Sequence, residues 1–524
     1  MQAQQFPDLE FRKLNELVHA YCSRNPKTRE FFQVDTDLTE IAKSAIHRNL
    51  NFTHYEVLTA VLREQYQRNA TIDAVDENLA AFSAGNAITV TTGHQLCLLG
   101  GPAYFFFKIL STIKLAQNLQ ALVPGKKIVP VFWLASEDHD KEEINHTYVN
   151  GNRLEWSTSQ NGAVGRFALD GFEDVLLQWI DSVEDDNLRN SFRAIWNRAT
   201  QFKTWAELTK SWVHECFGEW GLVVINPDEA RLKQLFAPVM KRELLQDVAF
   251  QCVTKSNEQL TQLGYHVQVN PREINLFYLS HQSRVRIERV EHSWHTTDKL
   301  HSWSQTQVLK ELEKHPENFS PNVLLRPLYQ EIILPNVAYV GGPGELAYWL
   351  QLKALFAEHE VPMPALVLRD SALLISPAIS KRLAKLAFNH RDLLRDKQEL
   401  VAMIIGQKPD FSLEKDELLR VFEVLSVRIA QVDPTLKASA MAEANRALAG
   451  IDQLQAKMWK ALKLKEEQKL SSLDKVWGEL YPSNNWQERS LNILKEAMAN
   501  DKELMRLLLH EFQPPASTLV IVES

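Results

Sequence analysis

The 524-residue sequence predicts an α/β fold in which a parallel sheet is covered by helices and followed by a long helical arm. Three observations support this prediction. Residues 87–134 show the pattern of a strand, a helix and a second strand. Residues 337–353 show a strand, a glycine-rich turn and a helix. Residues 418–480 carry apolar stripes at spacings of three and four. At this length we expect two or three domains.

The first strand–helix–strand unit begins with residues 87–92, which are apolar and β-branched and indicate a buried strand. Gly93 ends this strand, and the Gly-Gly-Pro sequence at 100–102 permits unusual backbone angles before a helix begins. A second apolar strand follows at 128–134. Two strands joined through a helix in this way predict parallel pairing with a right-handed crossover.

Polar side chains follow both strands, at the edge of a parallel sheet where ligands usually bind. The first strand is followed by Gly93, His94 and Gln95, and the second by Glu137, Asp138, His139 and Asp140. We interpret these residues as candidate site residues. The acidic group would also serve as the N-terminal cap of a helix that begins at Lys141, and the two interpretations are compatible.

The second motif contains a strand at 337–340 followed by Gly341, Gly342, Pro343, Gly344 and Glu345, and then a helix. Backbone N–H groups in such a turn can bind an anion. The motif is neither a Walker A loop nor a full G-x-G-x-x-G pattern. A glycine turn that only lets helix and strand pack closely is the alternative. Nearby Arg326, Gln330 and Glu345 favour a binding role.

A further apolar stretch, residues 221–225, predicts another core strand that ends in polar residues. Asn226, Pro227 and Asp228 follow it. This sequence is common in turns, and we therefore interpret Asn226 and Asp228 as turn residues rather than site residues.

The composition narrows the class of protein. The formal net charge is −8 and no basic patch stands out, which argues against a nucleic-acid partner. No export signal and no membrane-spanning stretch is recognisable. The four cysteines are widely spaced, which argues against disulfides and favours a cytoplasmic protein.

Four long sequence blocks resemble the bacillithiol-synthesis cysteine ligase family (BshC). They read TTGHQLCLLGGPAYFFFK, VPVFWLASEDHDKEEINH, FSPNVLLRPLYQEIILPNVAYVGGPGELAYWLQLK and LYPSNNWQERSLNIL. The resemblance covers nearly the whole chain. It implies a Rossmann-like parallel core with insertions, related to class I aminoacyl-tRNA synthetases, and an α-helical coiled-coil arm that forms a homodimer. It also implies an activity, the addition of cysteine to glucosaminyl-malate.

We expect the following domains: an N-terminal helical segment at 1–84, a Rossmann-like core at 85–390 with insertions at about 147–215 and 230–318, a coiled-coil arm at 391–483, and a C-terminal segment at 484–524 that returns to the core. The last segment is expected to end in a strand at 517–522.

Amide ligation requires an activated carboxyl group, which implies ATP as the adenine nucleotide and either an acyl-adenylate or an acyl-phosphate. Gly93, His94 and Gln95 lie where class I synthetases place their phosphate-contacting histidine signature. Lys108 is a candidate for a phosphate contact, and Arg326 for a two-point contact with a carboxylate such as that of malate. No lysine-rich loop of the KMSKS type is visible.

The candidate residues for binding the substrate amine or accepting its proton, together with His94, are Glu137, Asp138 and His139. Two other functions remain open at this point. One is a metal-dependent hydrolase using His94, Asp138, His139 and His146, although no H-E-x-x-H spacing is present. The other is a non-catalytic scaffold built on the helical arm.

Overall fold

The computed structural model describes residues 1–11, 14–48, 52–149, 152–199, 201–406 and 409–523. Its central element is a five-stranded sheet with the order β13-β12-β2-β3-β6, in which each neighbouring pair is parallel. The strands are β2 (Ala87–His94), β3 (Lys127–Leu134), β6 (Val223–Ile225), β12 (Asn336–Gly341) and β13 (Ala365–Leu368). The predicted parallel sheet is confirmed, as are its strands at 88–92, 128–134 and 337–340.

Helix α6 (Tyr104–Gln120) connects β2 to β3 and is almost completely buried. Gly100 and Gly101 have positive φ angles of 81° and 54° in the turn before it, as the sequence predicts. The register pairs Gly93 with Trp133 and His94 with Leu134, so β2 and β3 end side by side. The residues that follow these strands therefore leave the sheet at the same edge, which confirms the predicted placement of Gly93 and Glu137.

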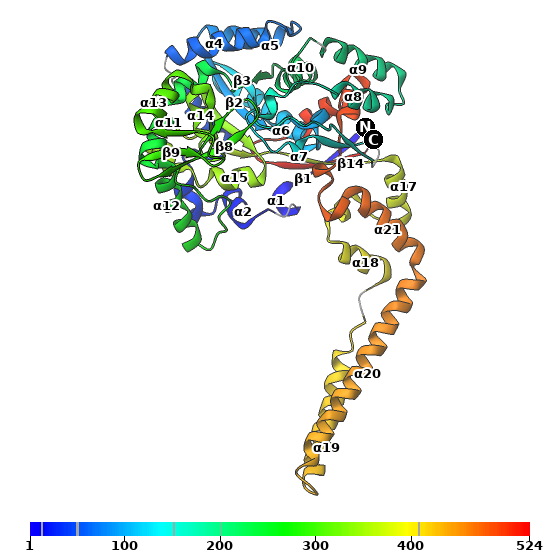
Figure 1. The fold of residues 1–524 in the computed structure, drawn as a ribbon. Helices are drawn as coiled ribbons and strands as arrows, with labels where there is room; N and C mark the ends of the chain where they lie inside the picture. The colour runs from blue at the N-terminus through cyan, green and yellow to red at the C-terminus, as the bar shows by residue number, and fades with distance from the viewer. Residues whose placement is uncertain (12–13, 49–51, 150–151, 200, 407–408, 524) are drawn as a thin grey trace. The chain divides into compact units, whose positions relative to one another are not determined.

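Alternate residues of the parallel strands pack into two apolar clusters on opposite faces of the sheet. Ile88, Val90 and Val340 pack with α3 (Leu38–His47) and the second half of α6. Val131, Trp133 and Tyr339 pack in the larger cluster with α11 (Ala230–Gln246) and other helices of the core, and Figure 1 shows helices around the sheet. Burial on both faces explains why these strands are continuously apolar in the sequence.

Two insertions interrupt the core. The first contains α7 (Lys141–Ile144), the antiparallel pair β4 (His146–Val149) and β5 (Asn152–Glu155), and the helices α8 (Phe172–Asp181), α9 (Asp186–Ala199) and α10 (Trp205–Phe217). The second contains α11, α12 (Val248–Gln262), α13 (Gln305–Lys314) and an antiparallel sheet of β7 (Leu276–Leu279), β8 (Arg284–Val290), β9 (Ser293–Thr296), β10 (Ser302–Ser304) and β11 (Phe319–Pro321). Helices α14 (Arg326–Ile333), α15 (Pro343–Trp349) and α16 (Lys353–Glu358) flank β12.

The N-terminal segment is not helical throughout, so the prediction for residues 1–84 is wrong at its beginning. Strand β1 (Gln2–Pro7) pairs in a three-stranded sheet, with the order β1-β15-β14, with the C-terminal strand β15 (Thr518–Glu523). This pairing joins the two ends of the chain and leaves no local signal in residues 2–7. Helices follow as α1 (Asp8–Phe11), α2 (Glu16–Cys22), α3, α4 (Phe52–Tyr66) and α5 (Asp73–Ser83).

The chain divides into two compact units, one formed by residues 3–373 and 487–522 and the other by residues 374–486. The second unit contains α17 (Pro377–Leu386), α18 (Lys397–Ile405), α19 (Ser412–Ala430), α20 (Leu436–Lys465) and α21 (Glu467–Leu480). Helices α19 and α20 run side by side (Figure 1), with Lys415 and Asp452 paired at 2.5 Å. The antiparallel helical pair is confirmed, whereas the finer domain boundaries stay a prediction.

Strand β14 (Ser371–Ile375) leads from the core unit into the second unit, and α22 (Leu494–Met498) and α23 (Glu503–Glu511) belong to the segment that returns to the core unit. The predicted C-terminal strand is confirmed by β15. No helix in the described part of the chain is long and apolar enough to cross a membrane.

A buried polar network braces β12 against β2. Asn336 accepts hydrogen bonds from the hydroxyls of Thr89 and Thr91, at 3.2 and 2.8 Å, and donates to Glu331 at 2.8 Å. Burial raises the pKa of Glu331 to about 7, although Arg48, 3.9 Å from its carboxylate, opposes the shift. This carboxyl group therefore changes charge near neutral pH inside the folded protein.

The raised pKa predicts how Glu331 affects stability. Because the folded protein holds the proton more tightly than the unfolded chain, ionisation of Glu331 removes stability as the pH rises from about 4.5 to 7. Over this range the wild type should lose on the order of 3 kcal/mol relative to Glu331→Gln. Urea unfolding of both proteins at several pH values measures the difference. A constant difference between pH 4.5 and 7 would contradict the prediction.

Candidate functional site

A cavity of about 450 Å³ lies at the carboxyl edge of the parallel sheet. Its size is within the range of roughly 300–1,000 Å³ that is typical of small-molecule sites. The lining includes the ends of β2 and β3, the turn after β12 and the residue after β13. Lining residues used below are Gly93, His94, Gln95, Tyr104, Lys108, Trp133, Arg326, Tyr339, Gly342, Gly344, Glu345, Tyr348, Arg369 and Arg489.

The buried Lys108 and the partly buried Glu345 form an ion pair that joins the end of β2 to the turn after β12. The ammonium group of Lys108, on α6, donates to the Gly93 carbonyl at 2.5 Å and to both carboxylate oxygens of Glu345 at 2.9 and 2.7 Å. Burial alone would raise the pKa of Glu345, but Lys108 and the Gly342 N–H lower it below its usual value, so the carboxylate is charged. These bonds occupy the ammonium group, so Lys108 positions the two turns in this structure.

The glycines of the second motif have different roles. A Cβ atom at Gly341 would lie 2.6 Å from Leu346, so this glycine lets the strand and helix pack closely, as the structural alternative predicts. Gly342 and Gly344 line the cavity. The Gly342 N–H donates to Glu345 at 2.8 Å, so the helix start is partly capped by its own chain.

Arg326 supplies a positive charge to the cavity from a partly buried side chain. Its guanidinium lies 5.5 Å from the centre of the Tyr339 ring and 6.0 Å from that of Trp349, and one nitrogen donates to Gln330 at 3.1 Å. The Nη2 atom is buried and makes no hydrogen bond within the described part of the chain. A Cβ atom at Gly93 would lie 3.2 Å from the Trp133 carbonyl oxygen and 3.4 Å from Nη1 of Arg326, so a side chain there would crowd the neighbouring strand. An unsatisfied guanidinium nitrogen at a cavity is suited to a carboxylate or phosphate oxygen.

Gln330 does not line the cavity, although it was predicted as a binding residue. It is buried, accepts from Arg326 and donates to Glu331 at 2.8 Å. It therefore acts on the cavity through the orientation of Arg326.

His94 lines the cavity as a neutral imidazole. Burial, with a contribution from the nearby Lys108 charge, lowers its pKa to about 4. Its Nδ1 atom lies 3.1 Å from the Gln95 carbonyl oxygen, which assigns the proton to Nδ1 and leaves Nε2 as an acceptor. In this state His94 can accept a proton or a hydrogen bond but does not add positive charge.

The acidic turn after β3 lies beside the cavity rather than in its lining. Gln95 connects the two, because its amide donates to Asp138 at 2.7 Å. Burial would raise the pKa of Asp138, but hydrogen bonds from His139 and Gln95 hold it well below its usual range. Glu137 is buried and paired with Lys233 at 2.5 Å, and burial raises its pKa. Catalytic roles for Glu137, Asp138 and His139 stay predictions.

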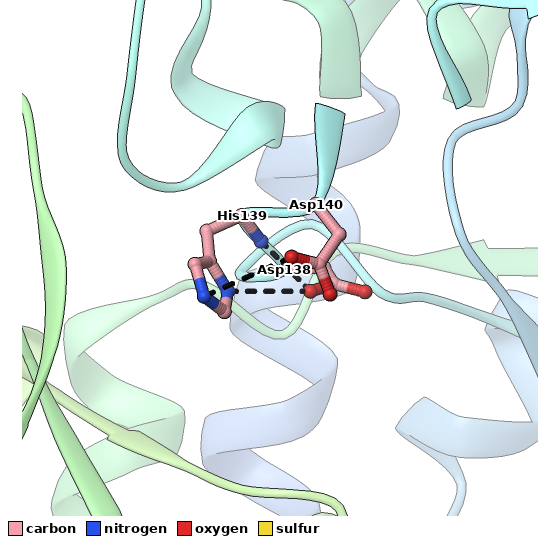
Figure 2. Close-up of side chains that lie close together, drawn as sticks. All are labelled: Asp138, His139 and Asp140. Atoms are coloured by element: carbon pink, nitrogen blue, oxygen red, sulfur yellow. Dashed lines mark hydrogen bonds and ion pairs between the residues drawn. The ribbon is translucent and has the colours of Figure 1, made fainter. Parts of the chain in front are cut away.

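Asp138, His139 and Asp140 bring their ligand atoms within 4.8 Å of one another (Figure 2). His94 and His146, the other ligands considered for a metal-dependent hydrolase, are not in this cluster. Arg284 lies 3.0 Å from the His139 Nδ1 atom and 3.9 Å from an Asp138 oxygen. A guanidinium at this position opposes the binding of a cation.

Asn226 and Asp228 do not line the cavity, and the Asp228 N–H donates to the Asn226 side chain at 3.2 Å, as expected for a turn, but both also contact neighbouring segments. Asp228 accepts a two-point contact from Arg166 at 2.6 and 2.7 Å and lies 3.2 Å from Lys233. Asn226 accepts a hydrogen bond from Ser136 at 2.5 Å. Because β6 is a strand of the same parallel sheet, these residues brace the acidic turn after β3 from the neighbouring strand end.

Several lining residues were absent from the sequence-based candidates, among them Tyr104, Tyr348, Arg369 and Arg489. Arg369 directly follows the last core strand, so the strand-end rule that identified His94 also applies to it. Arg489 follows no strand, and its only signal is its place within the fourth block of family resemblance.

Family models give an independent comparison. The Bacillithiol biosynthesis BshC N-terminal Rossmann-like domain matches residues 3–370, and the BshC C-terminal coiled-coil domain matches residues 372–524. The chain belongs to the bacillithiol biosynthesis BshC family. This confirms the family, the Rossmann-like core and the coiled-coil arm, whereas the likeness to class I aminoacyl-tRNA synthetases stays a prediction.

Curated relatives are similar to this chain over nearly the full length of both sequences. Proteins named "Putative cysteine ligase BshC" include one from Flavobacterium johnsoniae, 35% identical over 95% of this chain and 96% of its own. One from Cytophaga hutchinsonii is 34% identical over 96% and 95%, and one from Salinibacter ruber is 30% identical over 89% and 88%. The BshC relatives thus match both the core and the arm.

The Lys108–Glu345 pair predicts a large stability effect. Lys108→Met should lower the free energy of unfolding by up to about 3 kcal/mol, because it leaves the partly buried Glu345 carboxylate, 27% exposed, without its partner. The double variant Lys108→Met/Glu345→Gln should be more stable than Lys108→Met alone, since the uncompensated charge is gone. Guanidinium unfolding measures both. Equal losses in the two variants would show that the ion pair does not hold the turns together.

Proposed function

We propose that this protein is a cysteine ligase of bacillithiol biosynthesis that joins the cysteine carboxyl group to the amine of glucosaminyl-malate, with ATP as the activating nucleotide. The observation that carries the proposal is a cavity at the carboxyl edge of the sheet, lined by Arg326, Arg369 and Arg489, in a chain of the BshC family. Both ATP and the malyl group are polyanions, which suit such a lining.

The reaction forms a C–N bond between the cysteine acyl carbon and the substrate amine. The bond from that carbon to the activating phosphate oxygen breaks, and the amine loses a proton. The intermediate is an acyl-adenylate or an acyl-phosphate. His94 is suited to orient the substrate amine, because its neutral imidazole lines the cavity with Nε2 as a hydrogen-bond acceptor. Arg326 is suited to hold a carboxylate of the malyl group.

A direct assay tests the proposal. Purified protein with cysteine, glucosaminyl-malate and ATP should form an amide-linked thiol product together with AMP or ADP, and the nucleotide identifies the intermediate. His94→Leu should slow product formation by about 10-fold or more, because it removes the hydrogen-bond acceptor that orients the amine. Absence of product in the presence of all three substrates would contradict the proposal.

Asp138 offers a matched pair of variants. We expect Asp138→Asn to reduce ligation about 100-fold, because it loses the carboxylate that orients Gln95 at the cavity, while the melting temperature stays nearly unchanged. Asp140→Asn is the control, since Asp140 is exposed and its carboxylate lies 3.9 Å from His139. Near-normal turnover of Asp138→Asn, or a collapse of its melting temperature, would show that the residue is a structural cap.

The helical arm supports a homodimer. Helices α19 and α20 leave several apolar side chains exposed to solvent. Each helix can bury only the apolar side chains that face its partner, so the others need a further surface to cover them. They include Leu413, Val421, Val424, Val427, Leu454, Met458 and Leu464, with Val424 61% and Leu464 70% exposed. We propose that the arms of two chains cover these side chains.

Charged substitutions test the dimer. The triple variant Val421→Lys/Val424→Lys/Val427→Lys should sediment as a monomer where the wild type sediments as a dimer, with unchanged helix content by circular dichroism. A dimer that persists in this variant would place the interface elsewhere.

We also propose a cytoplasmic location and no nucleic-acid partner. All four cysteines are free thiols, which fits a reducing compartment, and the net charge of −8 does not favour a phosphate backbone.

A further inference from the structure

The segment that follows the arm re-enters the core unit beside the cavity. Its first turn, η8 (Gln487–Arg489), places Glu488 in the interior, where Arg369 donates two hydrogen bonds to it at 2.8 and 2.6 Å. The Ser371 hydroxyl donates a third at 2.5 Å. Both Arg369 and Glu488 are 3% exposed. The turn is thus fixed at a single point by a buried, bidentate ion pair.

Further bonds hold the residues after this turn against the loop between β2 and α6. The Ala103 N–H donates to the Leu491 carbonyl at 2.7 Å, and the Asn492 amide donates to the Leu99 carbonyl at 2.9 Å. The backbone on both sides of Arg489 is therefore anchored to the core. An anchored backbone reduces the number of positions that a long side chain such as arginine can reach.

Arg489 itself is exposed and lines the cavity. Its guanidinium makes no hydrogen bond or ion pair with any residue that the structure describes, whereas Arg369 is neutralised by Glu488 and Lys108 by Glu345. Together with the buried Nη2 atom of Arg326, it leaves two guanidinium groups of one cavity available to a ligand. Glu345 is the acidic side chain in this lining, and its charge is already balanced.

We propose that Arg489 binds an anionic oxygen group of a substrate and that Glu488 is the residue that positions it. The inference rests on the proposed function and adds a binding residue from the C-terminal segment to it. The ligand chemistry is a carboxylate or a phosphate, which an arginine contacts in the same two-point geometry. The anionic group belongs either to the malyl part of the acceptor or to the phosphates of ATP. Kinetics with each substrate varied separately distinguish these two sources.

The buried pair explains why the position can be specific. A buried ion pair contributes little net stability, because removing both charges from water offsets their attraction. Its effect here is geometric, since it fixes the turn immediately before Arg489. The chain also leaves the core just after Arg369, at residue 374, and returns just before Glu488, at residue 487. The Arg369–Glu488 pair therefore links, within the core unit, the residues that precede the second unit to those that follow it.

Steady-state kinetics with each substrate varied separately test the proposal. Arg489→Ala should raise the KM of one substrate, glucosaminyl-malate or ATP, by roughly 10- to 100-fold, which is the range for a lost charged hydrogen bond. The other KM should stay within about twofold and the melting temperature should be unchanged. Arg489→Lys should recover part of the loss. Arg506→Ala, an exposed arginine of the same segment outside the cavity lining, is the control and should leave both KM values unchanged.

The variant Glu488→Gln tests whether Glu488 positions Arg489. Its KM should rise for the same substrate as in Arg489→Ala, and the double variant Glu488→Gln/Arg489→Ala should show no further rise in that KM. Additive rises in KM would mean that Glu488 does not act through Arg489. Unchanged KM values in Arg489→Ala would overturn the binding role.

Calorimetric titration with ATP and with glucosaminyl-malate keeps this test separate from the proposed function. If wild-type protein binds one of them in an Arg489-dependent way but forms no product, the binding role holds and the ligase proposal fails. If Arg489→Ala forms product with normal KM values, the ligase proposal holds and the binding role fails. Absence of binding of either compound to the wild type would overturn the binding role as well.

Discussion

The ammonium group of Lys108 lies in the interior of the protein and donates to the Gly93 carbonyl and to both oxygens of Glu345. The two acceptors lie at different strand ends, Gly93 within the last residues of β2 and Glu345 after β12. A buried lysine without these acceptors would carry a large desolvation cost, so the two turns and α6 must assemble together. Tyr339 and the Gly342 N–H, which also donate to Glu345, extend the same arrangement into the cavity wall.

The charges around the cavity are balanced in pairs, with two exceptions. Lys108 is neutralised by Glu345 and Arg369 by Glu488, while His94 is neutral because burial lowers its pKa. Arg326 and Arg489 are left to act on a ligand. The core unit thus provides a cationic cavity whose positive charges come from distant parts of the sequence. This arrangement matches anionic substrates and explains how a chain with a net charge of −8 can bind them.

Much of the fold follows from local sequence patterns. The apolar runs at 88–92 and 128–134 predicted buried parallel strands, and the strand-end rule located His94, Gln95 and Glu345 at the site. The partners of the charged residues could not be predicted, because they come from distant parts of the chain. Lys108 was expected to contact phosphate, and its actual partner is Glu345.

Contacts between residues far apart in the sequence also explain the other differences between the predictions and the structure. Glu137 is paired with Lys233 from an insertion, and β1 pairs with the C-terminal strand β15, so neither contact leaves a periodic signal. Asn226 and Asp228 have the sequence of a plain turn, and only the neighbouring strand end reveals their hydrogen bonds with Ser136 and Arg166. Arg489 reaches the cavity only because the chain returns from the arm.

The proposed substrate site is formed by the end of β2 and the turn after β12, which Lys108 and Glu345 hold together. A crystal structure of the protein with glucosaminyl-malate and a non-hydrolysable ATP analogue tests it most directly. The account predicts that the acceptor lies in the cavity between residues 93–95 and 342–345, with an anionic group against Arg326. Density for both compounds outside this cavity would contradict it.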